Sequence, residues 1–287
     1  MKKYKIRKIL LVILAIFLCV AFYELLGIHV AYKKQPEVSN TTKKETKNGS
    51  WNECSENTER AVIIEKNPEA LLQRVRLIKN AKKEIILSTF AFQSDESGKL
   101  ILGALHDAAD RGVHIRLLVD GMESWIDMEG NPYFYGLSSH ENVEIKLYNK
   151  ANPLKPWKMM GRMHDKYLIA DGKRYILGGR NTYNYFLGDF PGHKNYDRDV
   201  LVVCDEPEKE NSVNQLSEYF ETIWEQEDSG YFHDNKKLAN RKSVKNAVLE
   251  LQNGYQKYFE ENKERICDTD YTDETFETEK IALVSNP

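Results

Sequence analysis

The sequence predicts an α/β fold, a mixed β-sheet flanked by helices, that follows one N-terminal transmembrane helix. Three segments of the chain predict this arrangement: an unbroken apolar run at the N-terminus, a strand–helix–strand pattern over 84–120, and a strand–turn–strand pattern over 162–179. A strand, a helix and a second strand form a βαβ unit with parallel pairing and a right-handed crossover. The tight turn of the third segment joins antiparallel strands, so the sheet is expected to be mixed.

The N-terminal run indicates a membrane segment. Residues 1–8 form a basic flank, and the apolar sequence from Ile9 to Tyr23 extends through Leu25, Leu26 and Ile28. About 20 apolar residues are enough to cross the hydrocarbon core of a bilayer. We therefore expect a single-pass membrane protein with a signal-anchor at 9–28, its basic flank in the cytoplasm and the remaining chain on the far side. A cleaved signal peptide is the alternative, although no convincing small-residue cleavage site follows.

Composition describes an ordinary globular surface behind this segment. Residues 29–60 are polar and lack periodicity, so a flexible linker is expected there. The formal net charge of −3 with 30% charged residues is unlike that of a protein that coats nucleic acid. Four cysteines are too few and too scattered for a disulfide framework, and none has metal-ligand spacing. A Cys54–Cys267 pair remains possible outside the cytoplasm.

The folded part is expected to begin near Ala61. Asn67 and Pro68 are typical of a helix start, with an N-cap followed by proline at the first helical position. The next expected elements are a buried strand over 84–92, an amphipathic helix over 97–112, and strands over 113–120 and 143–148.

The segment 162–181 carries the candidate chemistry. Residues 162–170 are strand-like, so His164 and Lys166, two apart, project from the same face. Asp171 and Gly172 form a hairpin-turn signal, and 174–179 returns as the partner strand.

Three further residues complete the set. Gly178 and Gly179 have no side chains, so the backbone there can approach a ligand closely, and Asn181 adds an amide donor. An imidazole, an ammonium and an amide on one face suit a phosphate group. Lysine and asparagine would donate to its oxygens, and histidine would act as nucleophile or acid.

The pattern H-x-K-x4-D-x6-G-G-x-N at His164, Lys166, Asp171, Gly178, Gly179 and Asn181 resembles the signature of the phospholipase D superfamily. The similarity extends from about Ala61 to Gln226 and resembles the first half of bacterial cardiolipin synthase-type enzymes. The resemblance implies a phospholipase D-like catalytic domain over 61–230, and the basic N-terminal flank predicts that this domain lies on the extracytoplasmic side of the membrane.

The resemblance also implies a mechanism. One motif histidine attacks the phosphodiester and forms a phosphohistidine, and the histidine of a second motif protonates the leaving alcohol. The second histidine then activates the incoming alcohol or water. Lysines and asparagines hold the phosphoryl oxygens, and neither a metal nor an organic cofactor is required.

The residues are assigned roles on this basis. His164, Lys166 and Asn181 are expected to act on the phosphate, and Asp171 belongs to the catalytic motif as structural support. Asp199, at the start of the strand in YDRDVLVV, is expected to orient the histidine, with Asp197 as a competitor.

Residues around the motif are assigned to substrate binding. Gly178, Gly179 and Arg162 are expected to bind the substrate. Lys155, Lys158 and Arg162 either favour an anionic headgroup or merely form a basic strand edge that resists pairing.

The chain departs from the superfamily in carrying a single motif. Residues 231–287 are expected to hold a helix, an exposed acidic connector over 259–280, and the first strand of a probable second half at 281–287. Two explanations remain open. Either the chain is part of a longer two-motif enzyme, or it self-associates and builds one site across a twofold axis, as small single-motif nucleases of the superfamily do.

Three functions follow from these expectations. The first is phosphatidyl transfer or phospholipid hydrolysis at a phospholipid membrane with anionic or zwitterionic headgroups. The second is a phosphodiesterase of the nuclease type, which the acidic balance disfavours, so nucleic acid is not an expected partner. The third is a non-catalytic membrane protein whose half-site only binds headgroups.

Overall fold

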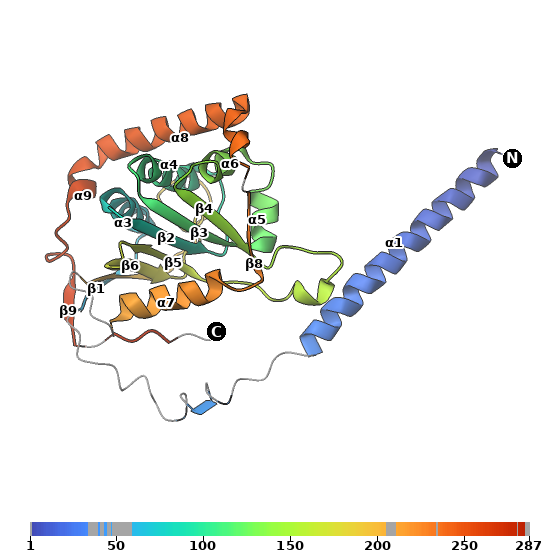
Figure 1. The fold of residues 1–287 in the computed structure, drawn as a ribbon, viewed down its shortest axis with the longest axis horizontal. Coiled ribbons are helices and arrows are strands. Elements are labelled where there is room, and N and C mark those ends of the chain that lie inside the picture. The colour runs from blue at the N-terminus through green and yellow to red at the C-terminus, as the bar shows by residue number, and fades with distance from the viewer. Residues whose placement is uncertain are drawn as a thin grey trace.

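The computed structural model describes residues 2–33, 40, 43–44, 47, 59–204, 211–233, 235–279 and 281–284. In these ranges one nine-stranded sheet lies between helices, and α1 projects away from it (Figure 1). The strands are β1 (Glu59–Ile64), β2 (Glu84–Thr89), β3 (His114–Asp120), β4 (Val143–Tyr148), β5 (Lys166–Ala170), β6 (Arg174–Gly178), β7 (Asp199–Val203), β8 (Ser229–Tyr231) and β9 (Phe276–Thr278). The helices are α1 (Lys2–Lys33), α3 (Asn67–Asn80), α4 (Glu96–Asp110), α5 (Gly121–Asp127), α6 (Pro132–Ser138), α7 (Ser212–Trp224), α8 (Lys242–Glu261) and α9 (Lys263–Cys267), with short 3-10 turns η2 (Pro156–Lys158) and η3 (Lys236–Asn240).

The sheet is mixed, as predicted. Its strand order is β8-β4-β3-β2-β5-β6-β7-β1-β9, and β2, β3 and β4 pair in parallel while every other neighbouring pair is antiparallel. The expected βαβ unit is β2–α4–β3. Asp95 begins α4 by accepting a hydrogen bond from Gly98 N at 3.0 Å. After α4, Gly112 adopts a positive φ of 88°, a conformation that favours glycine.

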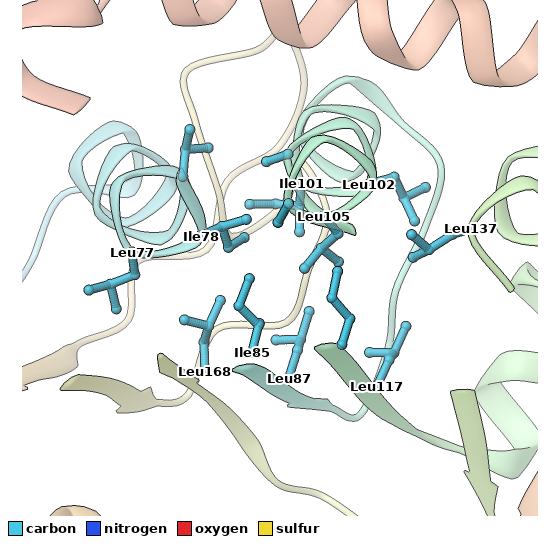
Figure 2. Close-up of a cluster of buried hydrophobic side chains, with 14 of the residues drawn as sticks. Leu77, Ile78, Ile85, Leu87, Ile101, Leu102, Leu105, Leu117, Leu137 and Leu168 are labelled. Carbon is cyan, nitrogen blue, oxygen red and sulfur yellow. The ribbon is translucent and has the colours of Figure 1, made fainter. Parts of the chain in front are cut away.

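Alternation along the strands produces a core on each face of the sheet. In β2, Ile85 and Leu87 point toward α3 and α4, whereas Ile86 points toward α7. Figure 2 shows the larger core, where Ile78 of α3 and Leu105 of α4 pack above Ile85 and Leu87. The smaller core joins α7 to the opposite face (Figure 1). Helices cover both faces of the sheet, so polar residues gather at the two ends of the strands. We call these two ends the edges of the sheet, as distinct from its outer strands.

The N-terminal boundaries differ from those expected. Helix α1 runs to Lys33, beyond the expected end at 28, and β1 begins at Glu59 rather than near Ala61. Most of the expected flexible linker at 29–60, and Cys54 with it, lies outside the described residues. Helix α3 has Lys66 as its N-cap. The side chain of Asn67, the expected cap, instead donates to Asn195 O at 2.9 Å.

The acidic segment near the C-terminus is mostly exposed, as expected, but a few of its residues tie it to α3. Arg76 of α3 is buried, and its guanidinium pairs with Asp268 at 3.5 Å and Glu274 at 2.9 Å. The ring of Tyr271 is buried against the same guanidinium, 3.8 Å from its centroid. Because a buried cation requires partners, it holds this acidic segment on the domain.

The last described residues also differ from the expectation. The structure places no strand on 281–284, the described part of the segment expected to begin a second half. The edge strand of this region is β9, which pairs with β1.

Candidate active site

Strand register brings the ends of the motif to one edge of the sheet. Lys166 begins β5 opposite Thr89, the last residue of β2. Gly178 ends β6 opposite Asp199, the first residue of β7. Because β5 runs antiparallel to both β2 and β6, the beginning of β5 lies beside the ends of its two neighbours.

His164 lies just before β5 rather than within a strand. The expectation of a strand over 162–170 was wrong for its first four residues because the paired ladder with β2 ends at Thr89. Its ring is edge-on to Phe90, with centroids 4.6 Å apart, and the residue remains exposed. Desolvation by the surrounding protein lowers the pKa of His164, and the neighbouring Lys166 cation lowers it further. The imidazole is therefore accessible and favoured in its neutral form.

Lys166 places a buried ammonium beside this imidazole. The residue is 5% exposed, and its Nζ donates to His164 O at 2.6 Å. The same Nζ lies 5.4 Å from the centroid of the Phe90 ring, so one aromatic ring contacts both motif side chains. Burial lowers the pKa of Lys166, while the carboxylates of Asp165 and Asp197 oppose that shift.

Asp165 lies between the two motif residues and has a different environment. Its Oδ2 accepts a hydrogen bond from Tyr219 Oη of α7 at 3.0 Å. Burial raises the pKa of the Asp165 carboxyl, partly offset by Tyr219 and Lys166. Asp165 therefore links the motif to α7.

Asn181 lies after β6 at the same edge. It is buried, and its Oδ1 accepts a hydrogen bond from Ala91 N at 3.2 Å. That bond fixes the amide and leaves its nitrogen, which carries two N–H groups, as the donor side. A fixed amide donor is suited to a phosphoryl oxygen.

The double glycine makes room for two carboxylates. A Cβ at Gly178 would collide with the Asp199 carboxylate, and a Cβ at Gly179 would collide with the Asp197 carboxylate. The expected role in close approach to a ligand stays a prediction. What the structure shows is close approach to β7 and the residues before it.

Asp199 is held by two arginines. Its Oδ2 lies 2.9 Å from Nη1 of Arg74 and 3.2 Å from Nη1 of Arg180, and all three side chains are buried. These contacts anchor the first residue of β7 between α3 and the double-glycine segment. Asp197, the competitor named from the sequence, acts electrostatically on Lys166 together with Asp165, which has the larger effect.

Arg162 is bound by acids of β3 and α5. Its Nε donates to Asp120 Oδ1 at 2.9 Å, and its Nη2 lies 2.9 Å from Glu123 Oε1. Its guanidinium also lies 4.9 Å from the Phe90 centroid. Asp120 accepts a further bond from Met163 N at 3.1 Å, which fixes the backbone immediately before His164.

Asp171 lies at the opposite edge of the sheet. Its carboxylate accepts hydrogen bonds from the backbone N–H groups of Lys82 at 2.8 Å, Lys83 at 2.7 Å and Glu84 at 3.0 Å. Five strand positions at about 3.3 Å each put it roughly 16 Å from Lys166. These bonds support the structural role expected for Asp171, and they hold its carboxylate at the edge of the sheet away from Lys166.

Sequence reasoning missed Phe90 and Asp120. Phe90 follows β2 directly, and its contacts with His164 and Lys166 depend on the β2–β5 pairing, which no local pattern specifies. Asp120 carried a usable signal, because it is an acid at the carboxyl end of a strand in a predicted βαβ unit. Within the described residues, no group of three or more His, Cys, Asp or Glu side chains could hold a metal ion.

Comparison with known families agrees with this geometry. A family model described as "Cardiolipin synthase, PLD-like domain" matches residues 74–224, more than half of the 287 residues. The chain belongs to this PLD-like family. The resemblance inferred from the motif and the predicted fold class are thereby confirmed. The motif histidine and lysine, and the acids that hold Arg162, all lie inside the matched range of the PLD-like domain.

Individual relatives of this PLD-like chain are larger proteins. An uncharacterized protein of Helicobacter pylori (strain J99 / ATCC 700824) is 30% identical over 212 residues, 69% of this chain and 39% of that protein. Cardiolipin synthase C of Escherichia coli (strain K12) is 29% identical over 171 residues, 55% of this chain and 34% of that protein. The chain thus spans about two fifths or less of these relatives. The solved structure of Nuc, a phospholipase D family member from Salmonella typhimurium, covers 61% of this chain and 99% of its own at 20% identity, with a TM-score of 0.44.

Proposed function

We propose that the PLD-like domain cleaves phosphodiesters of membrane phospholipids through a phosphohistidine on His164, by phosphatidyl transfer or by hydrolysis. Membership of the PLD-like family supports phosphodiesterase or phosphatidyltransferase chemistry. The choice of phospholipids is supported by α1, since Tyr4–Lys33 is long and apolar enough to cross a membrane, as an anchor or as a signal sequence.

One observation carries the chemistry: an accessible imidazole with a lowered pKa stands beside a buried ammonium. A neutral ring nitrogen has the electron pair that attacks phosphorus. The ammonium of Lys166 and the amide of Asn181 would stabilise the charge that develops on the phosphoryl oxygens.

The proposed reaction has two steps. A ring nitrogen of His164 forms a bond to phosphorus as the bond from phosphorus to the leaving alcohol oxygen breaks, and that oxygen takes a proton. Water or a second alcohol then attacks the phosphohistidine, loses a proton, and releases the neutral imidazole. The acid and base for these protons would be the histidine of a second motif.

The second motif is proposed to come from a second copy of this chain or from a two-motif protein of which this chain is a part. The intact mass of the native protein from its own membrane separates these cases. A mass that matches 287 residues predicts an active homodimer, and a much heavier chain predicts that the 287-residue piece is inactive on lipids.

The proposal is tested with the full chain, as dimer or native protein, in phosphatidylglycerol vesicles. Transfer yields cardiolipin and hydrolysis yields phosphatidic acid. We expect one of these products from the unchanged chain and from His114→Ala, but not from His164→Ala. His114 is a matched control because it begins β3 at the edge of the sheet away from the site. Absence of both products from the unchanged chain would refute action on this lipid class.

A further inference from the structure

Five large apolar side chains are exposed beside the candidate site. They come from α5 and from the segment 149–161, and we call them the apolar rim: Trp125 (65% exposed), Ile126 (65%), Leu154 (76%), Trp157 (47%) and Met160 (54%). Soluble surfaces seldom gather exposed aromatic and aliphatic side chains without a partner.

The two parts of the rim are tied together and to the site. Arg162, which follows the segment 149–161, donates to Asp120 and pairs with Glu123 of α5. Asn149 at the start of the segment packs against Gly121, where a Cβ would collide with it. The rim therefore lies on the approach to Phe90, whose ring contacts Arg162, and to His164, which is two residues after Arg162 in the chain.

The end of α1 fixes the level of the rim relative to the apolar helix. Tyr23 Oη donates to Leu154 O at 2.9 Å, and Gly27 packs against Pro156, whose ring leaves no room for a Cβ. Val30 and Tyr32 line the same cavity as Trp157 and Met160. In Figure 1 the segment 149–161, coloured yellow-green, extends from the domain to this end of α1.

These contacts have a consequence for a membrane-embedded chain. Tyr23 precedes Lys33 by ten residues, about 15 Å along a helix. If α1 spans a bilayer, Leu154 must lie at the depth of Tyr23. Trp157 and Met160 lie nearer the end of α1, beside the residues of that helix that line their cavity.

The segment is built to tolerate that position. Asn149 Nδ2 donates to Lys158 O and to Gly161 O at 2.6 Å, and Lys155 N donates to Asn152 O at 2.9 Å. Internal bonds of this kind reduce the cost of placing an irregular backbone near hydrocarbon.

We propose that the apolar rim docks on the interface of the lipid bilayer and holds the mouth of the active site against it. Tryptophan favours this interface, where its ring is apolar and its N–H meets headgroups. Lys155 is exposed beside the rim, Lys158 pairs with Asp228, and Glu123 is neutralised by Arg162, so apolar contact rather than charge drives docking. This inference rests on the proposal that α1 anchors the chain.

Docking is tested by fluorescence quenching with the full-length chain. Three variants each retain one tryptophan (Trp125, Trp157 or Trp224), with phenylalanine at the other three of the four positions 51, 125, 157 and 224. Each is reconstituted in phosphatidylcholine–phosphatidylglycerol vesicles with or without bromine on the acyl chains, and co-flotation is confirmed. We expect roughly twofold lower emission from Trp125 and Trp157 in brominated vesicles. Trp224, which is 4% exposed, should be unchanged and also reports folding.

Unquenched Trp125 and Trp157 in protein that floats with the vesicles would overturn the inference. If that protein is also a dimer that dissociates in Leu154→Ser, a second copy of the chain covers the rim instead of lipid. Quenching requires no turnover, so quenched rim tryptophans in a chain without lipid activity would retain docking and reject the proposed function.

A kinetic comparison tests what docking does. In an active preparation, Leu154→Ser should raise KM for vesicle phospholipid roughly tenfold and leave hydrolysis of a soluble p-nitrophenyl phosphodiester unchanged. Leu249→Ser is the matched control, because Leu249 is 57% exposed on α8, on the other side of the domain (Figure 1). Equal KM values for Leu154→Ser and Leu249→Ser would reject the assigned role.

Discussion

The two edges of the sheet use one motif in opposite ways. At the site edge, His164 is exposed and Lys166 is a buried cation that donates a hydrogen bond to the backbone carbonyl of His164. At the other edge, Asp171 accepts three backbone hydrogen bonds and closes the connection between α3 and β2. The motif thus contributes residues to both edges. The residues at one edge are suited to bind an anion, and the hydrogen bonds of the carboxylate at the other edge are already made within the protein.

The contrast between the two edges shows that residues of one motif can have different roles. A residue that a pattern fixes is not thereby a catalytic residue, since it can serve the scaffold that aligns the strands. Asp199 makes the same point from within the site edge, where two buried arginines neutralise its carboxylate. The comparison predicts that variants at the site edge change turnover and that variants of the scaffold change stability.

The largest effect is expected for His164→Ala. Loss of the nucleophile should reduce phosphodiester turnover by on the order of 10⁴-fold or more, about 5 kcal/mol of activation free energy, with little change in Tm. Steady-state kinetics on a soluble phosphodiester measure it, with His114→Ala as the control at the opposite edge. Comparable turnover in the two variants would contradict the assignment of the site edge.

Asp199→Ala is expected to destabilise the fold strongly. It leaves the cations of Arg74 and Arg180 buried without their carboxylate, and breaking a buried ion pair costs about 3–5 kcal/mol. Denaturant unfolding of the full chain in detergent measures the loss. Asp273→Ala provides the control, since Asp273 is exposed. An unchanged unfolding free energy would place the anchor of β7 elsewhere.

Asp171→Ala should cost less. Three hydrogen bonds to a charged acceptor are lost, but water can reach the freed N–H groups of Lys82 and Lys83, so we expect about 1–2 kcal/mol. Turnover per folded molecule should remain near that of the unchanged chain, as shown by thermal unfolding and kinetics on the same sample. A loss of turnover without a loss of stability would move Asp171 into the chemistry.

The smallest effect concerns pH. Attack requires neutral imidazole, and the lowered pKa of His164 places the acid limb of adduct formation below pH 6.5. Phe90→Ala removes the ring that packs against His164 and so reduces the desolvation that is the largest cause of that shift, and the limb should move upward toward 6.5. Adduct formation followed from pH 4 to 8 measures its position. A limb that stays in place would show that Phe90 does not desolvate the ring.

Much of the fold followed from local patterns, and the site followed from the motif. The βαβ unit and the hairpin after Asp171 depend on neighbours in sequence, so their strands were predictable. The contacts of Phe90 and the arginine pair around Asp199 join residues far apart in the chain, so the strand register reveals the first and only the packing of α3 reveals the Arg74–Asp199 pair. The ion pairs that tie the acidic segment to Arg76 were not predictable either, because they join residues 192 and 198 positions apart.

The central claim is that His164 becomes phosphorylated, and trapping the adduct tests it most directly. A phosphodiester with a p-nitrophenolate leaving group needs no acid to protonate it, so even a half-site can react. After an acid-free quench, peptide mass analysis should find on His164 the phosphoryl group with its remaining ester substituent, in the unchanged chain and in His114→Ala. An adduct on another residue, or turnover that persists in His164→Ala, would contradict the account.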